Sequence, residues 1–434
     1  MKRVMLKDIS LGKVNRVAGF VESIRNKKAM CFIVLRDVSG KLQITIEKSK
    51  HSKWDDMLAS ITTDTVIECQ GKIVKSEYVK LNGMEMYPDK VKILSSIAEP
   101  SPIVAPKGEE TNIDLRLDYR WIDIRTEKNT LMFKAQSCFI AACREFLNEN
   151  DFIEIHSPKL IGAESESGAG VFKVEYFDRN AYLAQSPQFY KQMAMASGLE
   201  RIYECGPVFR AEKFASRKHA TEFTGFDLEF SYIDSYKDVM KMEENMITYA
   251  LKAVKKKYGK QIKEVFDIDV IVPKKPFPVM DLHDVYEELE KRYGYKVDES
   301  EKGDLTTEGE RMIAKLSLDM FGHEFMFITG YSKDCRAFYH MRDKNGVPCG
   351  YDLIWKGVEI TTGAQREHRY DVLLKQCQEK GLVDDVKFYL DFFKYGMPPH
   401  GGFGIGVDRI TMIMFNVGIK EAEFIFRGPD RLNP

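Results

Sequence analysis

The stretch CGPVFRAEKFASRKHATEFTGFDLEF, residues 205–230, decides how the rest of this chain is interpreted. Apolar and charged residues alternate around Arg210 and again from Glu222 onwards, which predicts two strands joined by a loop. The loop contains the basic residues Lys213, Arg217, Lys218 and His219. Such a hairpin would present a cationic rim suited to a polyphosphate, beside Arg210, Glu212 and Asp227. Taken alone, an ordinary solvated loop is the commoner explanation, so the remaining sequence has to decide between the two.

Length and composition indicate a folded protein of two or three domains. The chain has 434 residues and a net charge of −1; 44% of the residues are hydrophobic and 30% are charged, as in globular rather than disordered proteins. The eight cysteines form no C-x-x-C pair and have no histidine at zinc-ligand spacing, which indicates free thiols in a reducing compartment. No apolar run has the length of a membrane span or a signal sequence. We therefore expect a cytoplasmic protein without membrane attachment.

Basic residues are concentrated near the N-terminus, where residues 1–50 hold 12 Lys and Arg against 4 Asp and Glu. Short β-type runs separated by turn residues extend from residue 14 to about 97, which predicts a five-stranded barrel of the oligonucleotide-binding kind, an OB-fold. In such a barrel, exposed side chains of the second and third strands contact unstacked bases. Phe32 and Gln43 are placed for this, with Arg25 nearby. The alternatives are that Phe32 belongs to the core and that Gln43 and Arg25 are ordinary surface residues.

The chain divides at a segment rich in proline and acidic residues, residues 99–116. We predict an OB-fold domain over residues 1–105, a linker or hinge over 106–128, and a larger domain over 129–434. An amphipathic helix over 130–148 and a strand ending at Pro158 open the larger domain, and a second long helix is expected over 234–258. We expect an α+β fold in which helices flank an antiparallel sheet.

The glycine-rich stretch GGFGIG, residues 401–406, is similar to a dinucleotide fingerprint, but no β-α-β unit surrounds it and a P-loop is absent. A nucleotide would therefore be held mainly by arginines on the antiparallel sheet. Arg409 lies where this stretch enters an apolar helix. Asp352 and Glu359 are seven residues apart, a spacing that favours two strands joined by a tight turn over one straight strand.

Three stretches together resemble the sequence motifs of class II aminoacyl-tRNA synthetases: FIEIHSPKL around Pro158, VFRAE with its loop and TEF, and GGFGIGVDRI. An OB-fold followed by such a catalytic domain is similar to the subclass of aspartyl, asparaginyl and lysyl enzymes. Within it, QSPQFYKQ, GFDLEF, ITTGAQREH and YGMPPHGGFG are most similar to the aspartyl-tRNA synthetases. The interval between the second and third motifs leaves no room for the large bacterial insertion, so the chain resembles the compact archaeal and eukaryotic type. The first motif implies a homodimer.

The resemblance implies an ATP site at the hairpin, with Arg210 and Arg409 as the catalytic residues. Arg210 would bind the α-phosphate and Glu212 the adenine amino group. Phe223 and Arg409 would cover the two faces of the adenine ring, and Arg409 would also reach the γ-phosphate. Two further sets complete the implied site: Arg217, Lys218 and His219 at the outer phosphates, and Asp352 and Glu359 as ligands of Mg²⁺.

The resemblance also implies an aspartate site. Lys191 and Arg366 would bind the carboxylate side chain of the substrate, with Arg366 as a bidentate clamp. The other residues implied there are Asp227 and Gln188 at the ammonium group, Glu166 on a loop closing over it, and Thr362, which stands where serine is usual.

The expected reaction is activation of L-aspartate with ATP and Mg²⁺, followed by transfer to the 3′ end of tRNA(Asp). In the OB-fold, the resemblance implies that Phe32 stacks on an anticodon base while Gln43 and Arg25 contact base edges. The sequence leaves open whether tRNA(Asn) is charged as well. Two alternatives remain. An asparaginyl enzyme would have no use for two cations facing a neutral amide, and a non-catalytic RNA-binding paralogue would have lost the ATP residues.

Overall fold

The computed structural model describes residues 1–103, 111–162, 170–213 and 216–434, which form two compact units, Met1–Thr111 and Asn112–Pro434. The first unit corresponds to the predicted OB-fold domain. Residues 112–128, which the sequence assigned to a linker, instead belong to the second unit, where α2 (Ile113–Asp118) and α3 (Arg120–Asp123) form. The reason is a packing contact, since the buried Arg120 donates hydrogen bonds to the backbone carbonyls of Glu421 and Glu423.

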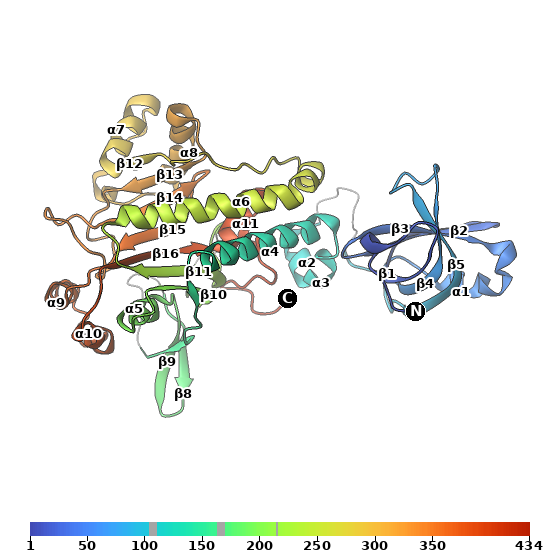
Figure 1. Cartoon of the computed structure of the whole chain (residues 1–434), viewed down its shortest axis with the longest axis horizontal. Coiled ribbons are helices and arrows are strands. Elements are labelled where there is room, and N and C mark those ends of the chain that lie inside the picture. Colours follow the sequence, from blue (N-terminus) through green and yellow to red (C-terminus); the bar gives the residue numbers. More distant parts are fainter. Residues whose placement is uncertain (104–110, 163–169, 214–215) are drawn as a thin grey trace. The chain divides into compact units, whose positions relative to one another are not determined.

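The N-terminal unit is a closed five-stranded barrel, as predicted (Figure 1). Its strands are β1 (Val14–Asn26), β2 (Met30–Asp37), β3 (Gly40–Glu47), β4 (Val66–Lys75) and β5 (Met84–Ser95). They pair in the order β1-β2-β3-β5-β4, and α1 (Asp55–Ser60) lies between β3 and β4 in the chain. Alternate apolar side chains, among them Ile33 and Ile44, fill the interior. Gly19 is needed where β1 passes close to β2, because a Cβ there would lie 2.1 Å from the Arg36 carbonyl oxygen.

An eight-stranded sheet forms the centre of the C-terminal unit, in the order β12-β13-β14-β15-β16-β11-β10-β6. Its strands are β6 (Ile153–Glu154), β10 (Arg201–Phe209), β11 (Glu222–Ser231), β12 (Val279–Asp281), β13 (Phe325–Thr329), β14 (Gly350–Trp355), β15 (Val358–Gln365) and β16 (His400–Gly406). Pairing is antiparallel from β13 to β10, and the outermost strands pair in parallel. The predicted hairpin over residues 205–230 is confirmed as β10 and β11, and the predicted turn between Asp352 and Glu359 joins β14 to β15. The strand expected up to Pro158 is shorter, because β6 ends at Glu154.

The long helices α4 (Glu127–Asn148) and α6 (Tyr236–Phe266) lie side by side against this sheet (Figure 1). Both predicted helices are confirmed, but α6 ends at Phe266 and not at residue 258. With α11 (Val407–Phe415) they contribute to the largest core, which contains Phe139, Leu251 and Phe403. Ser235 begins α6 by accepting a hydrogen bond from the Lys237 backbone N–H at 3.3 Å. These helices give the sheet a rigid support on which side chains can be positioned.

Smaller elements complete the unit. Next to β12 and β13, α7 (Leu282–Tyr293) and α8 (Thr307–Phe321) form a separate apolar cluster. Residues 260–302, to which the sequence assigns no chemical role, include α7, and α8 follows them. The remaining elements are α5 (Gln188–Ala196), α9 (Tyr370–Glu379), α10 (Lys387–Phe393), α12 (Ile419–Ala422), and a three-stranded sheet of β7 (Leu160–Ile161), β9 (Arg179–Leu183) and β8 (Lys173–Tyr176). Within the described part of the chain, the helices are all too short or too polar to cross a membrane.

Glu243 of α6 is a carboxyl group buried behind the sheet, where it accepts a hydrogen bond from the Tyr351 hydroxyl at 2.6 Å. Burial raises the pKa of Glu243 from 4.5 to about 8. The unfolded chain releases this proton near the lower value, whereas the folded protein keeps it until about pH 8. The stability that this group contributes is therefore present at low pH and lost as the pH rises through this interval.

We expect the substitution Glu243→Gln to reduce the loss of stability at alkaline pH, because glutamine keeps the shape and cannot ionise. Between pH 6 and pH 8, wild type should lose about 2 kcal/mol more than the variant. Urea unfolding of both proteins at the two pH values measures this difference. An identical pH dependence in wild type and variant would contradict the assignment.

Candidate active site

A pocket of about 300 Å³ is lined by residues of β10, β11, β15 and β16, with α5 and the start of α11 beside them. It brings together most of the predicted ATP and aspartate residues, namely Gln188, Lys191, Arg210, Glu212, Lys218, His219, Phe223, Asp227, Glu359, Thr362, Arg366 and Arg409. Arg217 and Asp352 do not line this pocket. Glu166 lies outside the residues that the structure describes, so its role remains a prediction.

Arg210 follows the last residue of β10, and its guanidinium lies over the Phe223 ring, 5.6 Å from the ring centroid. The backbone N–H of Arg210 donates to the Thr221 carbonyl at 2.9 Å, which continues the hairpin pairing beyond the strand end. Its buried Nε has no hydrogen-bond partner within residues 1–103, 111–162, 170–213 and 216–434. A cationic donor held in this way is available for an anionic ligand.

Arg409 lies in the first turn of α11, where the sequence placed it. Its Nη1 donates to the Glu359 carbonyl oxygen at 3.0 Å and lies 3.9 Å from Glu359 Oε1. Burial acts to raise the pKa of Glu359, but the surrounding cations, with Arg409 the strongest, outweigh burial and hold this pKa below its usual value. Glu359 is therefore ionised at neutral pH and can bind a cation.

Asp352 has a partner that the sequence did not indicate. Both of its carboxylate oxygens accept hydrogen bonds from Arg336, at 2.9 and 2.7 Å, and both side chains are almost fully buried. The Thr362 hydroxyl lies 2.9 Å from Asp352 Oδ1 and 3.1 Å from Glu359 Oε1, so it connects the two predicted metal ligands. This set of oxygens fits Mg²⁺ in chemical type. Asp352 can bind the ion, however, only if it shares its carboxylate with Arg336.

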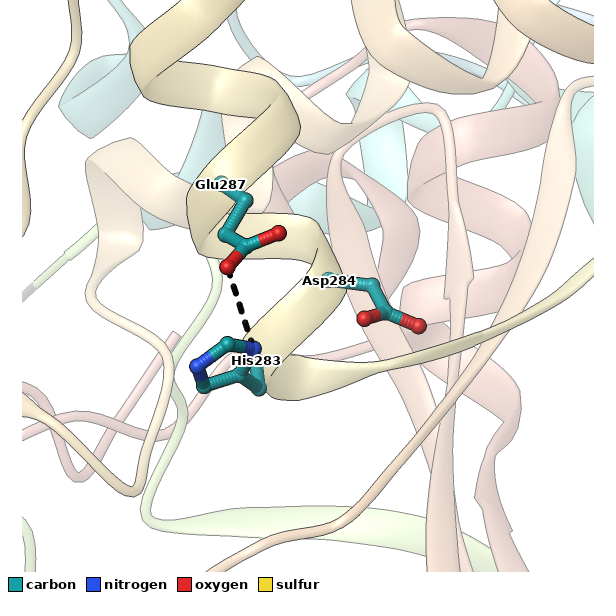
Figure 2. Close-up of side chains that lie close together, drawn as sticks. All are labelled: His283, Asp284 and Glu287. Atoms are coloured by element: carbon teal, nitrogen blue, oxygen red, sulfur yellow. Dashed lines mark ion pairs between the residues drawn. The ribbon is translucent and has the colours of Figure 1, made fainter.

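Another group of potential metal ligands lies on α7, outside the pocket. Figure 2 shows His283, Asp284 and Glu287 near the start of the helix, with His283 and Glu287 forming an ion pair of 3.6 Å. One ligand atom from each residue lies within 4.8 Å of the others, but all three side chains are exposed. Pairs of this spacing are ordinary on a helix surface, and we assign the group no role.

A buried cluster of charges lies where the aspartate site was predicted. Lys191 of α5 is 1% exposed, and its Nζ lies 2.9 Å from Asp227 Oδ1 and 3.5 Å from Glu229 Oε2. Arg366, directly after β15, donates through Nε to Glu229 Oε1 at 2.8 Å. Glu229 therefore connects the two predicted carboxylate-binding cations. Glu229 was not among the predicted site residues, although its position two residues after Asp227 places both on one face of β11.

The cluster is electrically balanced, with two cations and two carboxylates. Burial acts to raise the pKa of Glu229, but Arg366 and Lys191 outweigh it and hold the pKa below its usual value. His340 adds no positive charge, because burial and the neighbouring Arg366, 3.4 Å from its Nε2, lower its pKa well below the usual range. Both cations are therefore already neutralised by Asp227 and Glu229, so a substrate carboxylate has to share them with these two residues.

On the barrel, the predicted RNA-contacting residues lie on β1, β2 and β3. Arg25 lies over the Phe32 ring at 5.5 Å, and Phe32 is partly exposed, so the alternative that Phe32 belongs to the core is wrong. Gln43 donates to Thr45 Oγ1 at 3.1 Å and to Glu85 Oε2 at 3.2 Å. Glu85 had no sequence signal, because it comes from β5, which pairs with β3 only in the folded barrel.

An antiparallel sheet with an arginine-lined pocket, in a chain that also contains an OB-fold barrel, is the arrangement of class II aminoacyl-tRNA synthetases. The family of class II tRNA synthetases (D, K and N) matches residues 112–424, and the family of OB-fold nucleic acid binding domains matches residues 16–94. The chain belongs to the class II tRNA synthetases of the D, K and N type and is therefore an aminoacyl-tRNA ligase.

Relatives and solved structures resemble the chain over nearly its whole length. It is 38% identical to the aspartate–tRNA(Asp/Asn) ligase of Methanopyrus kandleri over 98% of this chain and 96% of the relative. It is also 38% identical to the aspartate–tRNA(Asp) ligase of Pyrococcus abyssi, over 98% of this chain and 97% of that relative. The crystal structure of asparaginyl-tRNA synthetase from Pyrococcus horikoshii with asparaginyl-adenylate superimposes with a TM-score of 0.90 at 30% identity, covering 100% of both chains. Aspartyl-tRNA synthetase from Entamoeba histolytica superimposes with a TM-score of 0.88 at 28% identity, covering 100% of this chain and 93% of that structure.

Proposed function

We propose that this chain activates L-aspartate with ATP and transfers it to the 3′ end of tRNA(Asp). Relatives named as aspartate ligases support this substrate. The observation that carries the proposal is that Lys191 and Arg366 both border the pocket and both contact Glu229. A substrate carboxylate can share Lys191 and Arg366 with Glu229 through charge-assisted hydrogen bonds, whereas the neutral oxygen of an amide accepts weaker ones.

Adenylate formation requires the α-carboxylate of aspartate to attack the α-phosphorus of ATP while pyrophosphate leaves. In this proposal, Arg210 binds the α-phosphate, where negative charge accumulates in the transition state. Phe223 and Arg409 hold the adenine ring between them, and Glu212 accepts a hydrogen bond from its amino group. Catalysis then consists of orientation and charge neutralisation, without a covalent enzyme intermediate.

The outer phosphates and their cation are assigned to the Glu359 side of the pocket. Glu359 would hold Mg²⁺ together with Asp352 and Thr362, and the ion would supply positive charge to the departing pyrophosphate. His219 lines the pocket and is placed for an outer phosphate. Arg217 donates to Asn416 Oδ1 at 3.3 Å, so it would have to change partner to reach a phosphate.

The ammonium group of aspartate is assigned to Asp227 and Gln188. Asp227 is already fixed by Lys191, so its remaining oxygen can accept a hydrogen bond from the substrate without reorganisation. Gln188 is buried and donates to Gln192 at 3.0 Å, which leaves its own carbonyl oxygen as an acceptor.

For the OB-fold, we propose that Phe32 stacks on an anticodon base. Phe32→Ala is then expected to weaken binding of tRNA(Asp) by about tenfold or more, because base–aromatic stacking contributes about 1–3 kcal/mol. Aspartate-dependent ATP–pyrophosphate exchange should stay unchanged, since it needs no tRNA. Filter binding and exchange measured on the same preparation check both statements. A loss of exchange would contradict this division of roles.

The asparaginyl alternative has one specific observation in its favour, the high structural similarity to an asparaginyl-tRNA synthetase. The buried pair of Lys191 and Arg366 favours the acid over the amide. The non-catalytic alternative is disfavoured, because Arg210, Phe223, Glu359 and Arg409 line one pocket. We further propose a cytoplasmic homodimer, the dimer resting on the resemblance of the stretch around Pro158 to the first synthetase motif.

Charging of two purified transcripts tests the proposed substrate. We expect aspartate to be attached to tRNA(Asp), and the same assay with tRNA(Asn) shows whether the chain accepts both tRNAs. Attachment of asparagine in preference to aspartate would favour the asparaginyl alternative. Absence of charging with either amino acid would contradict the proposed function.

A further inference from the structure

Glu310 of α8 is a buried carboxylate outside the predicted site residues. Its two oxygens accept hydrogen bonds from Lys218 Nζ at 2.7 and 2.8 Å. Oε2 also accepts a hydrogen bond from the Glu359 backbone N–H at 3.2 Å. Glu310 therefore connects three segments far apart in the sequence: α8, the loop between β10 and β11, and β15.

This pair is less exposed than ordinary surface ion pairs, because Glu310 is buried and Lys218 is partly buried. The side chains of Lys218 and Glu310 are 16% and 9% exposed. Burial raises the pKa of Glu310, and Lys218 opposes this shift. Exposed pairs cost little to break, whereas removal of one charge from a buried pair leaves the other uncompensated. Lys218 is thus held firmly by a helix that contributes no predicted site residue.

The contact with Glu310 holds Lys218 at the pocket. Lys218 is among the lining residues, and the backbone of Glu359, which shares Glu310 as its partner, also accepts a hydrogen bond from Arg409. An ammonium group has three N–H donors, and the contacts with Glu310 can use two. A third donor can then be directed at a ligand that lies between Arg409 and Lys218.

We propose that Glu310 is a positioning residue for ATP, which holds the Lys218 ammonium group at the outer phosphates. This inference rests on the proposed function, because that function places the phosphates on the Glu359 side of the pocket. The proposed role of Glu310 gives α8 a part in nucleotide binding. It also assigns the outer phosphates to Lys218 and not to Arg217 of the same loop.

The test is equilibrium binding of ATP with Mg²⁺ and of AMP to the full chain, without amino acid or tRNA. Glu310→Gln is the informative variant, since glutamine can still accept the Glu359 N–H bond but carries no charge for Lys218. We expect the Kd for ATP to rise about tenfold and the Kd for AMP to stay within twofold, because AMP lacks the outer phosphates. Glu308→Gln is the matched control on the same helix, where Glu308 forms an exposed pair with Arg311, and both constants should be unchanged.

A second comparison shows whether Glu310 acts through Lys218. Lys218→Met should weaken ATP binding at least as much as Glu310→Gln, and the double variant should be no weaker than Lys218→Met alone. The proposal would be overturned if the loss of ATP affinity in the double variant equalled the product of the two single-variant losses. It would also be overturned if the Kd for ATP were unchanged in Glu310→Gln, or if that variant lost affinity for ATP and AMP equally. If Glu310→Gln does not fold, Lys218→Met still has to weaken ATP binding selectively, and failure to do so overturns it as well.

Failure of the proposed function would give results different from those that overturn the role of Glu310. A wild-type chain that binds ATP but does not use aspartate would contradict the substrate assignment and leave the ATP–AMP comparison valid. A wild-type chain that binds neither nucleotide would contradict the proposed function itself and this inference with it.

Discussion

Arg210→Ala is expected to abolish adenylate formation, with a fall of at least about a thousandfold in aspartate-dependent ATP–pyrophosphate exchange. Removal of one oriented donor at a developing charge typically costs 10²–10³ in rate, and this substitution removes an entire guanidinium group. The geometry supports a large effect, because Arg210 is held between the β10–β11 pairing and Phe223, with its Nε available in the pocket. Binding of tRNA(Asp) should be nearly unchanged, since the anticodon contacts are assigned to the OB-fold.

The matched control is Arg292→Ala on α7, where Arg292 pairs with Glu288 outside the pocket. Its exchange rate should stay within twofold of wild type. Equal loss of exchange and tRNA binding in Arg210→Ala would indicate an unfolded domain. Exchange close to the wild-type rate would contradict the phosphate role of Arg210.

The second large effect is expected at Arg366. Arg366→Gln should raise the KM for aspartate by at least about a hundredfold, since a bidentate, charge-assisted contact is lost, while the KM for ATP changes little. The same substitution leaves Glu229 with only Lys191 as a cationic partner, so we also expect a destabilisation of about 3–5 kcal/mol. The single variant Arg366→Gln therefore changes both the stability of the protein and its recognition of aspartate.

The double variant Arg366→Gln with Glu229→Gln separates these two effects. Removal of both charges should restore much of the stability, because no buried charge is left uncompensated. Aspartate recognition should not return. Thermal unfolding and the KM for aspartate, measured on both variants, give the comparison. Recovery of aspartate use in the double variant would show that Arg366 serves only to neutralise Glu229.

The features that the sequence predicted well are local or carried by short motifs. Alternation around Arg210 predicted the β10–β11 hairpin, and period-two runs predicted all five barrel strands. Arg409 was placed correctly because a glycine-rich strand leads directly into an apolar helix. In these places the local pattern and the tertiary structure agree.

The features that it missed are buried polar partners distant in sequence. Glu310 and Lys218 are 92 residues apart, and Arg366 and Glu229 are 137 apart. Hydrophobic periodicity identifies the face that a side chain occupies but not the charged group opposite it. Arg336 is the plainest case, because its contact with Asp352 changes what is required of a predicted metal ligand. Residues 112–128 were assigned to a linker because the proline-rich composition before them gave no sign of the contact between Arg120 and the C-terminal segment.

We propose that the buried cations Lys191 and Arg366 select an acidic substrate beside an ATP site. ATP–pyrophosphate exchange by the wild-type chain, with aspartate or asparagine as the single amino acid, tests this claim most directly. We expect rapid exchange with aspartate and a specificity at least about a hundredfold lower for asparagine. Exchange driven equally well or better by asparagine would contradict it.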